Sequence, residues 1–194
     1  KGKSRDFTYK DIVLSQERRA IRKNKKNINI DLSGIAKGYS VDLIASYLKS
    51  ININNFLINI GGEIKVNKEN DEVFKVSIDD PSGNKQTIED IFLTNEAVAT
   101  SGTYQDFVEY KGKEISHIVN PKKLENISDL SLLVTVIHEN CTTADALATG
   151  LIAMDHDKII NFANSNNIAL MYLRNKDGNL EKKFSKSFIK YLSE

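Results

Sequence analysis

The hydrophobic positions of this chain change period along its length, and each change predicts an element. Short apolar stretches at 12–14, 20–21 and 28–30 are separated by charged residues, which predicts strands or a hairpin. Over 35–49 the apolar residues recur at spacings of three and four, as on one face of a helix. Residues 56–60 then predict a short buried strand that ends at Gly61 and Gly62.

The middle of the chain has the pattern of strands. Residues 73–78 and 88–93 predict two strands, with a turn at Asp80-Pro81-Ser82-Gly83 between them. Residues 97–119 are again strand-like, and Thr100, Ser101 and Gly102 predict a turn within them. The polar segment 120–129 is expected to be a loop.

In the last third of the chain, the apolar residues alternate between the spacing of strands and the spacing of helices. Residues 132–137 predict a strand of β-branched residues and leucine, and 142–154 have helical spacing. A helix, a strand and a helix are expected at 158–165, 169–173 and 187–192.

Composition narrows the class of protein without naming a function. The 194 residues are 40% hydrophobic and 27% charged, and no apolar run approaches the ~20 residues of a membrane span. Cys141 is the single cysteine, which excludes an internal disulfide, and we interpret it as a small packed residue. The net charge of +1 argues against nucleic acid as a partner.

The first 26 residues depart from this balance, with ten basic and three acidic residues. One interpretation is a solvated basic hairpin, and the other is an edge that faces an acidic surface or a preceding part of the protein. The chain begins at Lys1 without an initiator methionine, and we expect it to be part of a longer protein.

Two glycine-containing segments are candidate binding sites. The segment DLSGIAKGY at 31–39 places a carboxylate, Gly34 and Lys37 at the start of the predicted helix, where free N–H groups attract phosphate. The alternative is that its Asp or Ser only caps the helix. The segment NIGGE at 59–63 permits close approach of a ligand, and its alternative is an ordinary turn.

A third candidate is the segment ADALAT at 144–149. In a helix, Asp145 and Thr149 lie four residues apart on one face and present a carboxylate and a hydroxyl to the same point. Such oxygens suit Mg²⁺. The alternative is a hydrogen bond between the two side chains on a solvated face.

The fourth candidate is His117 in SHIVNP at 116–121, because a histidine at a strand end beside a proline-anchored loop can act as a general base. His138 and His156 lie among polar residues and are interpreted as surface groups. No zinc spacing, P-loop or Gly-x-Ser-x-Gly motif is present in the sequence.

Together these segments resemble the C-terminal portion of the ApbE family, the FAD:protein FMN transferases. The resemblance extends from about Asp31 to Tyr172 and is carried by motifs in the family's order. They are DLSGIAKGY at 31–39, VD at 41–42, NIGGE at 59–63, ATSGTY at 99–104, SHIVNP at 116–121 and ADALAT at 144–149.

The resemblance implies one α+β domain over 1–194, with mixed sheets packed with a few helices and without the family's N-terminal region. It implies an enzyme that binds FAD as substrate with Mg²⁺, attaches FMN to a Thr or Ser of an acceptor protein, and releases AMP. The implied roles are flavin-nucleotide contacts for Asp31, Lys37 and Val119, metal ligation for Gly34, Asp145 and Thr149, and a catalytic base at His117.

The sequence departs from the family pattern in three places, one of which is the absent N-terminal region. Asn120 replaces an aspartate after the histidine motif, and Ala148 occupies a position that is often acidic. An FAD-binding protein or an FAD pyrophosphatase without transfer to protein is therefore the alternative function. The resemblance also implies a redox-pump subunit or similar flavoprotein as acceptor, and a lipoprotein on the extracytoplasmic side of a bacterial envelope.

Overall fold

The structure is a computed structural model that divides into two compact units, Lys1–Leu32 and Ser33–Glu194, each described here by itself. The prediction that 1–194 form one domain stays a prediction. No helix in the described part of the chain has the length and hydrophobicity needed to cross a membrane. The described residues are 7–69, 72–80, 86–103, 107–110, 113–116, 118–121, 125–127, 132–176 and 179–193.

The first unit is a small antiparallel hairpin. A short 3₁₀ helix, η1 (Tyr9–Asp11), leads into β1 (Ile12–Ser15), which pairs with β2 (Ala20–Lys23). The Thr8 side chain and the Asp11 carboxylate cap η1 reciprocally. The hairpin predicted from the apolar stretches at 12–14 and 20–21 is confirmed, whereas 28–30 form no strand.

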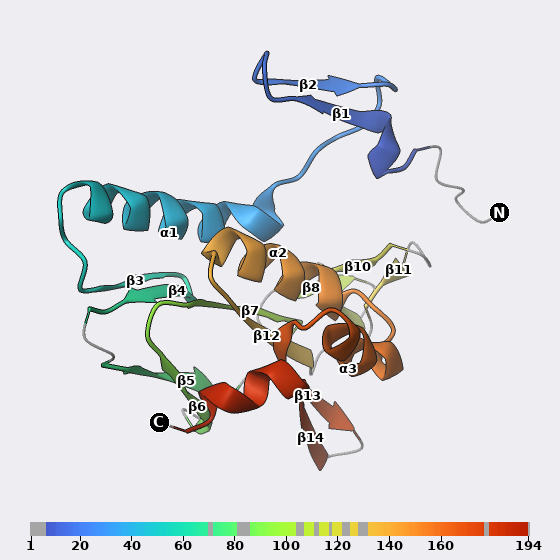
Figure 1. Cartoon of the computed structure of the whole chain (residues 1–194). Helices are drawn as coiled ribbons and strands as arrows, with labels where there is room; N and C mark the ends of the chain where they lie inside the picture. Colours follow the sequence, from blue (N-terminus) through green and yellow to red (C-terminus); the bar gives the residue numbers. More distant parts are fainter. Residues whose placement is uncertain are drawn as a thin grey trace. The chain divides into compact units, whose positions relative to one another are not determined.

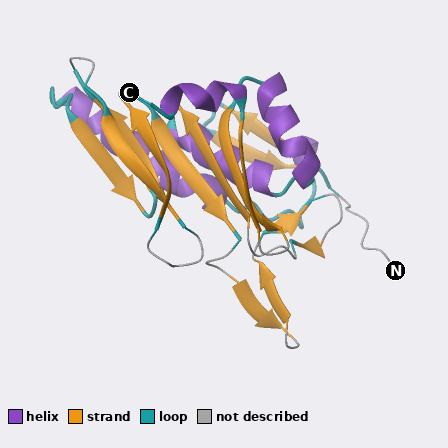
Figure 2. Ribbon diagram, turned by 90° about the horizontal axis from the view of Figure 1, so that it is seen from below, coloured by secondary structure: helices purple, strands orange, loops and turns teal. Residues whose placement is uncertain are grey.

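The second unit is built on a six-stranded sheet in the order β14-β13-β12-β7-β4-β3, and Figure 2 shows strands side by side with helices along them. Every described strand pair is antiparallel. The predicted α+β class is confirmed, with antiparallel rather than mixed sheets. The strands are β3 (Phe56–Ile60), β4 (Glu63–Asn67), β7 (Ala97–Gly102), β12 (Leu132–His138), β13 (Ala169–Lys176) and β14 (Asn179–Phe184).

Three helices cover one face of this sheet, and a hairpin with a short helix covers the other (Figure 1). The first face carries α1 (Ser33–Ser50), α2 (Cys141–Ile152) and α3 (His156–Ser165). On the second face lie β5 (Phe74–Asp79), β6 (Thr87–Leu93) and the 3₁₀ helix η2 (Lys186–Tyr191).

The burial of alternate residues shows why β12 lacks a polar face. Val134 and Val136 pack in the cluster beneath α2 and α3, while Leu133 and Ile137 pack against the β5–β6 side. Because both faces are covered, the strand is apolar at nearly every position, as the sequence pattern predicted.

Four short strands form two further antiparallel pairs. They are β8 (Phe107–Tyr110) with β9 (Lys113–Ser116), and β10 (Val119–Asn120) with β11 (Glu125–Asn126). Apart from Val119, the β10–β11 pair falls within the segment 120–129, which was expected to be a loop. Of the predicted turn at 80–83, residues 81–83 lie outside the described residues.

One turn prediction is wrong. Thr100, Ser101 and Gly102 continue β7 and pair with β12, and the Thr100 and Thr135 hydroxyls lie 2.9 Å apart. The pairing of these hydroxyls across the ladder explains how a polar stretch occupies a central strand, since each buried hydroxyl gains a partner.

Candidate functional site

The helices α1 and α2 meet at two glycines of α1. A Cβ atom added to Gly38 would lie 2.4 Å from the Cys141 carbonyl oxygen and 2.8 Å from the Asp145 Cβ. One added to Gly34 would lie 2.9 Å from the Thr149 Cγ2. Only residues without a side chain allow this approach, so the glycines of the first motif bring Asp145 and Thr149 against the start of α1.

Asp145 is held at this contact by the backbone of the other helix. Its side chain is buried, and its Oδ2 accepts a hydrogen bond of 2.9 Å from the Gly38 N–H. In an α-helix that N–H ordinarily donates to the carbonyl of Gly34. Donation to Asp145 competes with that bond, which leaves the Gly34 carbonyl oxygen a better acceptor for another partner.

Thr149 lies one turn further along α2 and connects the helix pair to the sheet. Its Oγ1 lies 3.1 Å from the Oγ of Ser101 in β7. The alternative interpretation of a Thr149 to Asp145 bond on a solvated face is wrong, because Asp145 is buried and bonds Gly38. Ser101 is a site residue that the sequence pattern missed, since its segment was expected to be a turn.

Lys37 extends from α1 toward the turn between β3 and β4. Its Nζ lies 2.8 Å from Oε1 of Glu63, and its Cδ would lie 3.5 Å from a Cβ added to Gly61. Gly61 and Gly62 have φ angles of 60° and 96°, so the segment NIGGE is a tight hairpin turn as well as a wall of the site.

Glu63 is the second functional side chain that sequence reasoning left without a role. Its carboxylate is buried, and burial raises its pKa above the ordinary 4.5, while the hydrogen bond from Lys37 opposes the shift and the charge of Asp145 adds to it. The sequence signal was a lone acid directly after two glycines.

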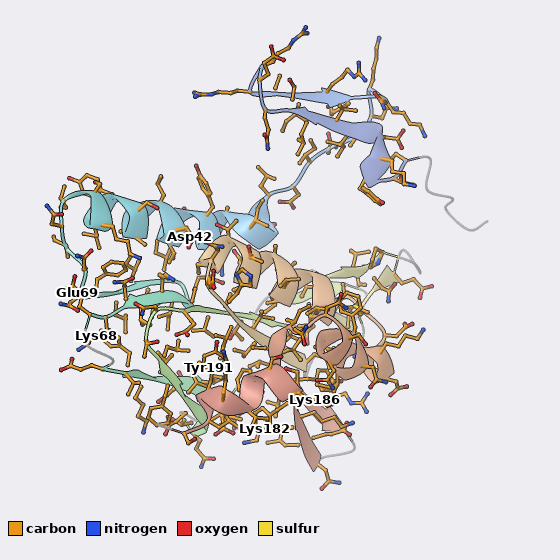
Figure 3. All side chains as sticks on the ribbon, in the orientation of Figure 1. Asp42, Lys68, Glu69, Lys182, Lys186 and Tyr191 are labelled. Atoms are coloured by element: carbon orange, nitrogen blue, oxygen red, sulfur yellow. The ribbon has the colours of Figure 1, made fainter. Side chains whose placement is uncertain are left out.

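Asp42 fixes the start of α2 from the opposite helix (Figure 3). It accepts hydrogen bonds from the Cys141 N–H at 2.9 Å, the Thr142 N–H at 2.8 Å and the Thr142 hydroxyl at 2.6 Å. Asn140, the residue at the N-cap position, makes no side-chain bond to the helix. Asp42 therefore caps α2 in its place.

The structure does not test the roles of three further predicted site residues. Asp31 is exposed and belongs to the first unit, and Val119 is exposed in β10, paired with Asn126. His117 lies outside the described residues. The predicted roles of all three stay predictions. His138 and His156, interpreted as surface groups, are half-buried.

The oxygen atoms at the α1–α2 contact fit a hard divalent cation. A buried carboxylate at Asp145, a hydroxyl at Thr149 and the Gly34 carbonyl are all oxygen donors. Among the described residues, no group of three or more His, Cys, Asp or Glu side chains is placed to hold a metal. This donor set suits Mg²⁺, which takes few protein ligands and completes its shell with phosphate and water.

The fold and site together define an α+β protein in which α1 contacts α2. Oxygen atoms and one lysine line this contact among the described residues, and such a lining suits a phosphate-bearing ligand with a cation. The ApbE family model matches residues 2–172. The match covers most of the chain, and the chain therefore belongs to the ApbE family.

Relatives and solved structures agree with this membership. The chain is 34% identical to the FAD:protein FMN transferase of Vibrio cholerae, over 93% of this chain and 55% of that protein. It is 33% identical to that of Haemophilus influenzae, over 91% and 52%. The chain thus spans about half the length of these relatives.

The fold matches two solved structures closely. The flavin transferase ApbE of Vibrio cholerae superposes with a TM-score of 0.79 at 33% identity, over 95% of this chain and 59% of that one. The ApbE protein of Thermotoga maritima gives 0.83 at 28% identity, over 96% and 60%.

Proposed function

We propose that this chain carries the diphosphate and metal end of an Mg²⁺-dependent FAD:protein FMN transferase. The observation that supports this most directly is the contact of α1 with α2, where Gly34 meets Thr149 and Gly38 meets Asp145. Gly38 and Asp145, which are hydrogen-bonded at this contact, lie 107 residues apart in the sequence. The relatives supply the reaction class, since they are FAD:protein FMN transferases.

The proposed reaction is an in-line substitution at phosphorus. The hydroxyl oxygen of an acceptor Thr or Ser bonds to the FMN phosphorus of FAD, and the bond from that phosphorus to the bridging oxygen breaks, so that AMP leaves. The hydroxyl proton passes to a base, for which the resemblance implies His117. Such a reaction requires positioning and charge stabilisation more than covalent help from the protein.

The described residues would divide this work between them. Asp145, Thr149 and the Gly34 carbonyl would hold Mg²⁺, which would supply neutralisation of the diphosphate charge when bound. Lys37 would place a positive charge on the phosphate oxygens beside the start of α1. The Gly38 N–H holds Asp145 in one orientation, and Ser101 does the same for the Thr149 hydroxyl.

The test is covalent transfer to protein. The protein is incubated with FAD, Mg²⁺ and an acceptor with the family-type Ser/Thr flavinylation motif, and the acceptor is examined by intact mass spectrometry for an added FMN. We expect transfer that Asp145→Asn lowers by at least about 100-fold, the scale on which loss of one oriented electrostatic group acts. Asp157→Asn, at an exposed position on α3, is the matched control and should retain activity.

Chromatography of the same mixtures separates the alternatives. AMP and FMN released without a labelled acceptor indicate an FAD pyrophosphatase, and bound FAD without AMP indicates a flavin-binding protein. Either result contradicts the transferase proposal. The redox-pump acceptor and the extracytoplasmic lipoprotein location stay predictions, and the first is tested by offering different acceptor proteins in this assay.

A further inference from the structure

Glu63 is a buried acid whose cost of burial calls for an explanation. Its side chain is 2% exposed, and its Oε2 has no hydrogen-bond partner in the described part of the chain. Burying a carboxylate is unfavourable unless it is paired and hydrogen-bonded, and here only Oε1 is paired, with Lys37. A neutral side chain of similar shape would fill this position at lower cost, so fold stability alone does not account for the charge.

The Glu63 carboxylate restrains the side chain of Lys37 through their ion pair. Its side chain is 49% exposed, and a lysine in that position samples many rotamers when it has no partner. The ion pair with Glu63 restrains the ammonium, and the stem passes Gly61, where an added Cβ would lie 3.5 Å from the Lys37 Cδ. The positive charge is thereby held on the buried Glu63, while the backbone of Lys37 directly precedes Gly38, whose N–H binds Asp145.

The surrounding charges make this restraint matter for an anionic ligand. Asp145 lies close enough to Glu63 to raise its pKa, so two carboxylates share the region and Lys37 is the cation bonded to one of them. A phosphate approaching this site meets repulsion unless the ammonium is directed toward it. The position of Lys37 therefore affects whether a diphosphate is accepted.

We propose that Glu63 is a positioning residue, which acts on a diphosphate ligand by holding the ammonium of Lys37, a residue of α1, at the start of β4. The inference rests on the proposed function in that the ligand is taken to be FAD. It gives a role to the buried Glu63 carboxylate, which takes no part in metal ligation or in the transfer step of the proposed function.

A double-mutant cycle on FAD binding tests this dependence. The dissociation constant for FAD in Mg²⁺ is measured by flavin fluorescence for wild type, Glu63→Gln, Lys37→Met and the double variant. We expect Glu63→Gln alone to weaken binding about 10-fold, the scale of a residue that orients a ligand contact. In the Lys37→Met background the same change should have less than about a twofold effect, because residues that act through one another are not additive.

Riboflavin, which has no phosphate, is the second probe. Its binding should be unchanged by Glu63→Gln, whereas a general disturbance of the site would weaken riboflavin and FAD alike. Glu63→Asp, which withdraws the carboxylate by one methylene, should fall between wild type and Glu63→Gln for FAD. This variant keeps the test decisive if the glutamine variant folds poorly by circular dichroism.

The matched control is Glu89→Gln, because Glu89 makes an ion pair of the same 2.8 Å length with Lys182 on the other side of the sheet. It should leave FAD binding unchanged. Equal losses from Glu63→Gln in both backgrounds, no loss at all, or no FAD binding by the wild type would each overturn the proposal. Failure of FMN transfer with an intact binding cycle would overturn the proposed function alone.

Discussion

Replacing Gly38 by alanine tests the helix contact on which the site depends. In an unconstrained helix this change is favourable, by about 1 kcal/mol. Here the new Cβ would lie 2.4 Å from the Cys141 carbonyl oxygen and 2.8 Å from the Asp145 Cβ. Because ordinary contacts are about 3.5 Å, the helices must separate by roughly 1 Å. We expect the free energy of unfolding to fall by about 1–3 kcal/mol.

Gly150 is the matched control, since a Cβ added there meets nothing within 4 Å and the residue is exposed in α2. Gly150→Ala should raise the free energy of unfolding by about 0.5–1 kcal/mol. Urea unfolding followed by circular dichroism measures both variants. If Gly38→Ala is as stable as Gly150→Ala, the close contact of the helices and the reasoning from it are wrong.

Three further predictions concern acids and the thiol near the site. Asp42→Asn should lower the free energy of unfolding by about 2 kcal/mol in urea, since three donors lose a charged acceptor, and Asp157→Asn should change it little. Burial raises the pKa of Cys141 to about 12, so a thiol reagent at about pH 8 should label this cysteine only after unfolding. Burial also raises the pKa of Glu63 above 4.5, so the folded state binds the proton of this carboxyl more tightly than the unfolded state does. The stability that the group contributes is therefore lost as pH rises. Glu63→Gln should therefore gain stability relative to wild type as pH rises above 4.5 in urea titrations.

The elements that the sequence predicted well are those whose burial is one-sided or complete. The helix expected at 35–49 is α1, and the strand expected at 132–137 is β12. In β12 the apolar run follows directly from the two faces that are covered. In α1 the helix is present as predicted, but Tyr39, Leu43 and Tyr47 of the predicted apolar face are exposed, and the buried residues are Gly38, Val41 and Ala45. The common face of Asp145 and Thr149 was predictable as well, because four-residue spacing on a helix places both side chains on one side.

The missed elements are those whose inward positions are polar. In β4 the buried residues Glu63, Lys65 and Asn67 alternate with apolar residues, so the strand lacks the continuous apolar run that marked residues 56–60. Each of the three has a partner distant in sequence, as when Lys65 donates to the carbonyl of Glu139 at 2.7 Å. Such partners come from tertiary contacts that local pattern does not contain, and Ser101 and Glu63 were missed as site residues for the same reason.

The cap that Asp42 places on α2 ties formation of the site to completion of the fold. The N–H groups of Cys141 and Thr142 at the start of α2 donate to a residue 99 and 100 positions earlier in the chain, while the side chain of the adjacent Asn140 makes no cap bond. Partial opening that lifts α1 therefore frays α2 and removes the Gly38 partner of Asp145 in the same event. A half-assembled site is thus disfavoured, and the amides of Cys141 and Thr142 should exchange with solvent in the same cooperative unit as α1.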